Sequence, residues 1–545
     1  MKYITNPILK GFNPDPSICR VGEDYYIATS TFEWFPGVQI HHSKDLKNWK
    51  VVAQPLNRVE QLDMKGVPDS CGVWAPCLSY KEGTFYLVYT NVKSFDGVWK
   101  DTPNYVVTTN DILGAWSDSI YLNSGGFDGS FFHDENKTWF TNMLVDHRGA
   151  KFFGGVELQE YDIKKKKLVG KTFYLTTGTK LGCTEGPHLY KRNGYYYLIL
   201  AEGGTEYGHA STILRSKQVT GPYVEHPKNP ILTCKDNPQH PIQKSGHASM
   251  IEASNGDWYI VFLVGRPLTT HGRCVLGRES AIEEIIWVDD WPILKNKTNL
   301  PRVKIPMPEL AEYAFDKECI RDNFDSSSLN INFQSLRVPT NENWVSLTER
   351  PGFLRLKGKE SLTSMHTQAL IARRIQHFKV EVSTSIDFEP DNFQQMAGLV
   401  LYYNTGHYHY LNISTNGDNK LISIVSSNNF DTVEQGEKVI IPKNTTVILK
   451  ASIENENLQF SFSTHTSTFT NIGKVLDMSV LSDDHVRDGS ERYRPAFTGS
   501  FVGLCCQDLK TNRKHADFDW FDYKEIDTES NYKDVELLSI NQKMG

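Results

Sequence analysis

The stretch Gly11-Phe12-Asn13-Pro14-Asp15-Pro16-Ser17-Ile18-Cys19 sets the pattern on which the fold of this sequence depends. Asp15 stands between two prolines, just ahead of an apolar pair. Proline fixes its own φ and favours an extended conformation in the residue before it. We therefore expect an extended backbone at Asp15, which would hold a carboxylate firmly at the start of a strand. Taken alone, the same residues also fit an ordinary turn that leads into a strand.

Four further copies of this pattern follow along the chain. Each copy has a polar or aromatic leading residue, two small residues or prolines, a mostly apolar pair, a turn, and an aromatic residue eleven positions after the leading one. The leading residues are Asp15, Trp74, Asp128, Glu185 and His247, and the aromatic residues are Tyr26, Phe85, Trp139, Tyr196 and Trp258. A repeat of roughly 55 to 60 residues built from strands and turns is typical of propeller blades. Residues 1–305 are therefore predicted to form a five-bladed β-propeller.

The repeat ends at a proline-rich segment, residues 299–308, which we interpret as a linker. Beyond it, strand-like stretches such as residues 397–403 predict a β-sandwich over residues 320–545. The predicted fold class is thus all-β, with a propeller domain followed by a sandwich domain. His407 and His409 share one face of a predicted strand, but two ligands fall short of a tetrahedral metal site.

Composition restricts the classes of partner. The net charge of −7 over 545 residues is small and no long basic block is present, so neither nucleic acid nor an anionic membrane surface is an expected partner. No run approaches the ~18 apolar residues of a membrane helix, and the N-terminus lacks the regions of a signal peptide. Nine cysteines without a regular framework are typical of reduced thiols. These features predict a cytoplasmic protein.

The five leading residues of the repeat would meet in space. The innermost strand of each propeller blade lines the central channel, so equivalent positions fall on one ring. Three carboxylates placed close together raise one another's pKa and destabilise a fold, which indicates a functional site. Two carboxylates on either side of a glycosidic bond are the minimum for its hydrolysis, and a third can keep the proton donor protonated. A non-catalytic sugar-binding propeller is the alternative from another class, but it gains nothing from three converging acids.

Four motifs, in order along the chain, resemble those of glycoside hydrolase family 43 and of its two-domain β-xylosidases. They are Asn13-Pro14-Asp15-Pro16-Ser17, Trp74-Ala75-Pro76, Phe127-Asp128-Gly129-Ser130 and Thr184-Glu185-Gly186-Pro187-His188. The similarity covers essentially the whole chain, and it implies that the propeller is the catalytic domain and that the sandwich is concanavalin-like. It implies an enzyme that removes xylose from the non-reducing ends of β-1,4-xylo-oligosaccharides with inversion, together with arabinofuranosidase side activity. A dedicated α-L-arabinofuranosidase is the nearest alternative, because the same catalytic trio serves both activities within the family.

The resemblance also implies roles for individual residues. Asp15 would be the general base, Glu185 the general acid, and Asp128 the residue that orients the acid and keeps its pKa raised. A substrate pocket would be formed by Phe32, Trp74, Phe127, Thr205, His247 and Arg278. A loop of the sandwich, residues 497–501, would reach over this pocket, although the resemblance does not indicate which of its two phenylalanines does so.

Cofactor and assembly are further expectations from the resemblance. No cofactor is required and no metal ligand is assigned, but a calcium ion near His247 is left open because some members of the family carry one near the matching histidine. Members similar to this chain often form homotetramers, so we expect a homo-oligomer.

Overall fold

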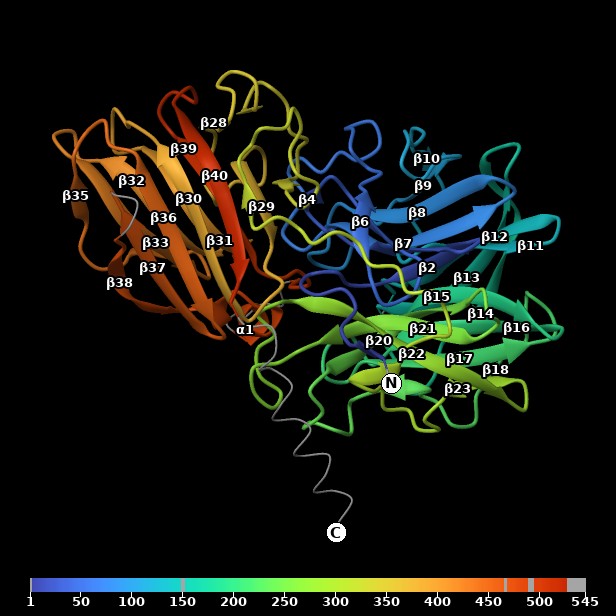
Figure 1. Ribbon diagram of the computed structural model, residues 1–545. Helices are drawn as coiled ribbons and strands as arrows, with labels where there is room; N and C mark the ends of the chain where they lie inside the picture. The colour runs from blue at the N-terminus through green and yellow to red at the C-terminus, as the bar shows by residue number, and fades with distance from the viewer. Residues whose placement is uncertain (1, 149–151, 465–467, 489–494, 527–545) are drawn as a thin grey trace, which may run out of the picture.

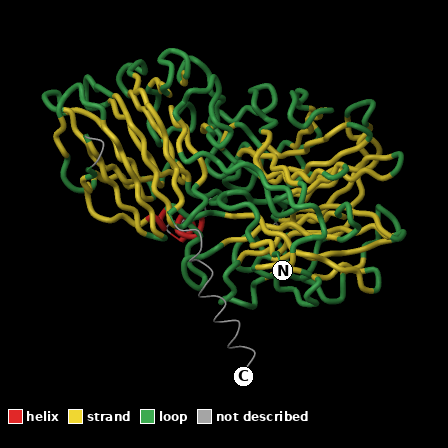
Figure 2. The backbone as a smooth tube through the Cα atoms, viewed as in Figure 1, coloured by secondary structure: helices red, strands yellow, loops and turns green. Residues whose placement is uncertain are grey.

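The computed structural model describes residues 2–148, 152–464, 468–488 and 495–526, and it consists almost entirely of strands and loops (Figures 1 and 2). Two β-rich domains lie side by side. One is coloured blue to yellow-green in Figure 1 and the other yellow to red. Within the described residues, the one α-helix is α1 (Asp483–Asp488), which follows a 3-10 turn, η1 (Met478–Val480). This architecture confirms the predicted all-β fold class.

The N-terminal domain is a five-bladed propeller. Each blade is an antiparallel sheet of four strands, and the fourth blade gains a short fifth strand. The blades are β2 (Ser17–Val21), β3 (Asp24–Thr29), β5 (Gln39–Ser43), β6 (Lys50–Ala53); β7 (Gly72–Lys81), β8 (Thr84–Val92), β9 (Asn104–Thr109), β10 (Ile120–Tyr121); β11 (Ser130–Asp134), β12 (Lys137–Val145), β13 (Phe153–Asp162), β14 (Lys167–Thr176); β15 (Glu185–Arg192), β16 (Tyr195–Glu202), β17 (Ala210–Ser216), β18 (Val224–Glu225), β19 (Leu232–Thr233); and β20 (Gln243–Glu252), β21 (Trp258–Gly265), β22 (Arg278–Val288), β23 (Trp291–Leu294).

Short turns join the first two strands of each blade, with two residues between the strands in the first four blades and five in the fifth. In the fourth blade Arg192 pairs with Tyr195 across Asn193 and Gly194, both of which have positive φ. Asn-Gly is the preferred pair for such a two-residue turn, because its left-handed backbone matches the twist of the flanking strands. The turn therefore sets the register, and with it the face of the blade on which each side chain lies.

The ring of blades is closed by the two ends of the domain. The innermost strands β2, β7, β11, β15 and β20 contact one another in a circle. β1 (Tyr3–Thr5) pairs with β24 (Lys304–Pro306), where Ile4 lies opposite Ile305 and both are buried. The interpretation of residues 299–308 as a linker is therefore wrong in part: burial of Ile305 turns this segment into a strand that closes the propeller.

The C-terminal domain is a sandwich of two antiparallel sheets whose inner faces enclose a large hydrophobic core. The first sheet contains β25 (Arg321–Asp322), β27 (Val345–Ser346), β28 (Leu354–Lys357), β30 (Lys379–Asp387), β36 (Val447–Glu454), β37 (Asn457–Ser463), β38 (Thr470–Asp477) and β40 (His515–Glu525). The second contains β29 (Ala369–Arg374), β31 (Gln395–Asn404), β32 (His407–Thr415), β33 (Lys420–Asn428), β34 (Asp431–Glu434), β35 (Val439–Ile441) and β39 (Phe501–Asp508).

The two domains share a hydrophobic core and a small sheet. β4 (Trp34–Phe35), which directly follows Phe32 and Glu33, pairs with β26 (Ser335–Leu336) at the start of the sandwich region. The Trp34 ring stacks on Phe501 with 3.7 Å between centroids. The sandwich is thus held against the first blade, next to the channel entrance. The domain limits given above, 1–305 and 320–545, stay predictions. No helix in the described part of the chain is long and apolar enough to span a membrane.

Candidate active site

The five leading residues of the repeat lie either just before an innermost strand or at a register shift within one. Asp15 and Asp128 stand two residues before β2 and β11, with φ of +54° and +55°. Trp74, Glu185 and His247 lie at register shifts within the pairing of β7, β15 and β20. Irregularities of this kind redirect side chains and are common beside active sites. Register shifts thus place Trp74, Glu185 and His247, whereas Asp15 and Asp128 share a left-handed backbone ahead of their strands.

The expected extended backbone at Asp15 is wrong. A φ of +54° lies in the left-handed region, which aspartate tolerates better than most residues. Flanking hydrogen bonds hold this strained conformation, from the Asn13 N–H to the Arg278 carbonyl at 2.9 Å and from the Ser30 N–H to the Pro14 carbonyl at 3.2 Å. The surrounding backbone overrides the local preference of a residue before proline.

One pocket brings together every site residue that the sequence predicts. It is lined by Asp15, Phe32, Trp74, Ala75, Phe127, Asp128, Glu185, Thr205, His247, Arg278 and Phe497. These side chains come from all five blades, and the last comes from the sandwich domain. The pocket therefore lies at the channel entrance that faces the second domain.

Asp15 is held as a carboxylate by positive and hydrogen-bonding groups. Its Oδ2 accepts a hydrogen bond from the Ser30 hydroxyl at 2.6 Å, and its Oδ1 lies 3.4 Å from Arg278 Nη1 and 3.6 Å from His247 Nδ1. Burial by itself would raise the pKa of Asp15, but Arg278, His247 and Ser30 together outweigh burial and keep the pKa below its ordinary value. Asp15 is therefore ionised at neutral pH.

Glu185 has the opposite character. Burial, reinforced by the negative charge of Asp15 and opposed by Arg278, raises the pKa of Glu185 to about 8. A carboxyl group with this pKa keeps its proton at neutral pH and can donate it. Asp15 and Glu185 therefore form a pair of one ionised and one protonated carboxyl group, which is the division of roles that acid–base hydrolysis of a glycoside needs.

Asp128 contacts the backbone next to Glu185. Its Oδ2 accepts a hydrogen bond from the Gly186 N–H at 3.1 Å, which fixes the peptide that follows Glu185. Burial, with Glu185 and Asp15 beside it, raises the pKa of Asp128 well above its ordinary value. The charge that raises the pKa of Glu185 comes from Asp15. A role of Asp128 in keeping that pKa raised stays a prediction, whereas its contact supports an orienting role.

Aromatic side chains form the walls of the pocket. Trp74 lies 4.9 Å from Phe127 and 6.1 Å from Phe32 between ring centroids, and its indole N–H donates to the Ser70 carbonyl at 3.0 Å. All three rings are almost fully buried. Such apolar faces suit the carbon-bound hydrogens of a pyranose ring and leave the carboxyl groups to contact its polar atoms.

The sandwich contributes Phe497 to the pocket. Its ring lies 5.4 Å from Trp74 and 6.0 Å from Phe32, and its carbonyl accepts hydrogen bonds from Arg278 Nε at 3.1 Å and Nη2 at 2.8 Å. Arg278 Nη1 also donates to the Thr205 hydroxyl at 2.8 Å. Phe501, the other phenylalanine of the predicted loop, packs in the core between the domains. Residue-level sequence reasoning could not choose between them, because neither has a local signal that distinguishes core from pocket.

His247 lies where the family resemblance would allow a calcium ion. Its pKa is lowered by burial, against the opposing charge of Asp15. A side chain at Gly186 would come within 3.0 Å of His247 Nε2, so the imidazole fills the space beside Gly186, the residue that follows Glu185. No group of three His, Cys, Asp or Glu side chains among the described residues is placed to share a metal ion. Calcium in proteins is also bound by carbonyl oxygens and water molecules, so a calcium ion near His247 stays a prediction.

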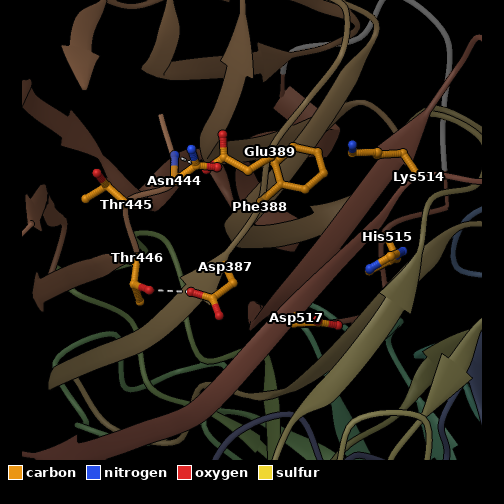
Figure 3. Close-up of a pocket in the computed structure, with 9 residues that line it drawn as sticks. All are labelled: Asp387, Phe388, Glu389, Asn444, Thr445, Thr446, Lys514, His515 and Asp517. Atoms are coloured by element: carbon orange, nitrogen blue, oxygen red, sulfur yellow. Dashed lines mark hydrogen bonds between the residues drawn. The ribbon is translucent and has the colours of Figure 1, made fainter. Parts of the chain in front are cut away.

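A second hollow lies on the sandwich domain and is lined by none of the residues of the propeller pocket (Figure 3). Its carboxylates are neutralised by neighbours: Asp387 by Arg350 at 2.8 Å and Asp517 by Arg355 at 2.7 Å. Glu389 pairs with the buried Lys420. This hollow is lined by structural ion pairs and by Phe388, whereas the propeller pocket is walled by Phe32, Trp74 and Phe127.

The propeller with its carboxyl-lined pocket and the appended sandwich define the class of protein: the chain belongs to glycoside hydrolase family 43. Residues 4–292 match Glycosyl hydrolases family 43, and residues 321–524 match the beta xylosidase C-terminal Concanavalin A-like domain. These matches confirm the resemblance that the four motifs indicate.

Individual relatives are similar over nearly the whole chain. A beta-xylosidase of Bacillus subtilis is 49% identical, with 96% of this chain and 99% of the relative covered. A non-reducing end alpha-L-arabinofuranosidase of Bacteroides ovatus is 34% identical, with 96% of each chain covered. The crystal structure of xylan beta-1,4-xylosidase from Bacillus halodurans C-125 has a TM-score of 0.93 and 48% identity, and covers 96% of this chain and 100% of that one.

Proposed function

We propose that this chain is an inverting exo-β-1,4-xylosidase that removes single xylose units from the non-reducing ends of xylo-oligosaccharides, with some α-L-arabinofuranosidase activity. The observation that carries the proposal is the pocket in which an ionised Asp15 and a protonated Glu185 lie among aromatic walls, with Phe497 of the second domain at its side. The xylosidase names of close relatives support the substrate, and the arabinofuranosidase relative supports the side activity.

In the proposed mechanism Asp15 is the general base and Glu185 the general acid. Asp15 takes a proton from a water molecule as the water oxygen attacks the anomeric carbon. The bond from that carbon to the glycosidic oxygen breaks, and Glu185 donates its proton to the departing oxygen. The products are α-xylose and an oligosaccharide shortened by one unit. Asp15 then releases one proton and Glu185 gains one, which restores both groups for the next turnover.

The remaining pocket residues are assigned to substrate binding. Phe32, Trp74 and Phe127 would pack against the sugar ring, and Thr205, His247 and Arg278 would lie near its hydroxyl groups. Arg278 is suited to this, because guanidinium groups donate several hydrogen bonds in a fixed geometry. Phe497 would limit the depth of the pocket to one sugar unit, which is what exo attack needs.

Three further parts of the proposal concern the cofactor requirement, the cellular location and the assembly of the enzyme. Catalysis needs no cofactor, since the two carboxyl groups supply the acid and base. The chain would act in the cytoplasm on imported oligosaccharides, and it would assemble as a homotetramer. Chelator treatment, cell fractionation and light scattering of the purified protein test these three points in turn.

Hydrolysis of matched substrates tests the activity. We expect turnover of 4-nitrophenyl β-D-xylopyranoside and of β-1,4-xylobiose, with slower turnover of 4-nitrophenyl α-L-arabinofuranoside. β-1,3-Xylobiose is the matched linkage control, because a 44% identical relative from Vibrio is a xylan 1,3-beta-xylosidase. Asp15→Asn serves as the inactive control. Preference for the arabinofuranoside would point to a dedicated arabinofuranosidase, and no turnover of any glycoside would favour a sugar-binding protein.

Inversion is tested separately by NMR of the first product. α-Xylose should accumulate before mutarotation, because water attacks from the face opposite the leaving group. Early appearance of β-xylose would require a covalent intermediate and would contradict the role given to Asp15.

A further inference from the structure

Ser70 lies behind the pocket wall, in the loop between β6 and β7, and is fully buried. It does not line the pocket, and no motif of the sequence singles it out. Its φ of +56° is in the left-handed region, which is strained for serine. A buried residue that is held in such a conformation indicates that the surroundings require its exact placement.

The three polar atoms of Ser70 connect three separate parts of the pocket. Its carbonyl accepts the indole N–H of Trp74 at 3.0 Å. Its N–H donates to Glu33 Oε2 at 3.1 Å, and Glu33 directly follows Phe32. Its hydroxyl oxygen accepts the N–H of Phe497 at 3.1 Å. One residue thus joins the first blade, the second blade and the sandwich domain behind their pocket-lining aromatic rings.

The peptide of Phe497 is held on both sides by the propeller. Its carbonyl is bound by Arg278, and its N–H is bound by Ser70. Arg278 also lies in the pocket beside Asp15, so a change there would alter catalysis directly. The Ser70 hydroxyl is therefore the contact that determines the position of Phe497 without itself reaching the substrate.

We infer that Ser70 is a positioning residue that couples docking of the sandwich domain to the fit of the sugar, because its hydroxyl sets the place of the Phe497 ring over the pocket. This inference rests on the proposed function for its kinetic consequence. Loss of the hydroxyl frees the Phe497 N–H and lets the ring move away from Trp74 and Phe32. Substrate binding then weakens more than the chemical step, since Asp15 and Glu185 keep their own contacts.

Kinetics of Ser70→Ala and Ser70→Gly provide the first test. Both variants keep the backbone N–H and carbonyl, and glycine also relieves the strain of a positive φ, so folding is preserved in at least one of them. We expect KM for 4-nitrophenyl β-D-xylopyranoside to rise about two- to tenfold, the effect of one neutral hydrogen bond, with a smaller change in kcat. Ser249→Ala is the matched control, because the buried Ser249 hydroxyl also accepts a backbone N–H between blades, that of Ile18 at 2.9 Å, and its KM should be unchanged.

A double-mutant cycle distinguishes positioning from general stability. If Ser70 acts through the Phe497 ring, then Ser70→Gly should not raise KM further once the ring is removed by Phe497→Ala. Additive effects, or an unchanged KM in Ser70→Gly, would overturn the inference while leaving xylosidase activity of the natural chain intact.

A crystal structure of Ser70→Gly gives a readout that does not depend on activity. We expect the Phe497 ring to leave its place 5.4 Å from Trp74 and 6.0 Å from Phe32. A ring that stays at these distances would contradict the inference, even if the natural chain hydrolysed no xyloside and the proposed function itself had failed.

Discussion

At the scale of single residues, the proposed role of Glu185 as general acid predicts the alkaline side of the pH dependence of kcat/KM. Because the pKa of this acid is raised to about 8, kcat/KM should fall as pH rises through about 8, where the proton is lost. The acidic limb should lie below the pH range in which an ordinary aspartate titrates, because Arg278, His247 and Ser30 outweigh burial and hold the pKa of Asp15 below its ordinary value. A pH–rate profile with 4-nitrophenyl β-D-xylopyranoside measures both limbs. An alkaline limb near pH 5 would contradict the role given to Glu185.

Asp128 has a predicted tuning role that its own variant can test. If the charge of Asp128 keeps the pKa of Glu185 raised, Asp128→Ala should move the alkaline limb to lower pH as well as reduce kcat. If Asp128 only orients Glu185 through the Gly186 N–H, kcat should fall while the limb stays near pH 8. Glu157→Gln is a control, since this carboxylate lies on β13, outside the pocket.

At the scale of elements, the pairing of β1 with β24 closes the propeller. Ile4→Ala should lower the free energy of unfolding by about 2–5 kcal/mol, because a buried isoleucine loses its packing and leaves a cavity. Tyr3→Ala, on the same strand but 45% exposed, is the matched control and should change stability far less. Chemical denaturation of both variants measures the difference. Equal stability of the two variants would mean that this pairing does not hold the ring closed.

At the scale of elements, the positions of the strands were more predictable than the backbone conformation of the residues between them. The eleven-residue spacing from Asp15 to Tyr26 depends on local chain geometry, and the paired strands β2 and β3 agree with it. The conformation of Asp15 was not predictable in the same way. Its positive φ depends on hydrogen bonds with Arg278 and Ser30, and the first of these residues lies more than 260 positions away in the chain.

At the scale of the whole molecule, Glu33 links pH to the stability of the domain junction. It lies buried between the first blade, Asp69 and Arg337, and burial, reinforced by Asp69 and opposed by Arg337, raises its pKa to about 8. A group whose pKa is raised by folding stabilises the folded state fully below its unfolded pKa, near 4.5. This contribution is lost as pH rises through about 8.

The variant Glu33→Gln tests this dependence, because the amide cannot titrate. Between pH 5 and pH 8.5 the natural chain should lose thermal stability relative to Glu33→Gln, as measured by the shift in Tm. Glu23→Gln is the matched control, since Glu23 is exposed in a turn of the same blade, and it should follow the natural chain. Parallel curves for the natural chain and Glu33→Gln would show that Glu33 titrates normally.

The sequence by itself determined the repeat, the all-β class and the five leading residues that meet in the pocket, because each depends on a local pattern of turn residues, strands and motifs. Phe32, Thr205 and Arg278 were expected there only from the resemblance to the family. Only the tertiary structure decided that Asp15 adopts a left-handed backbone, that residues 304–306 close the ring and that Phe497 rather than Phe501 enters the pocket. Each of these outcomes depends on contacts between segments hundreds of residues apart. Local preferences cannot encode such contacts, because burial and hydrogen bonding across the domains outweigh the small free-energy differences that local preferences represent.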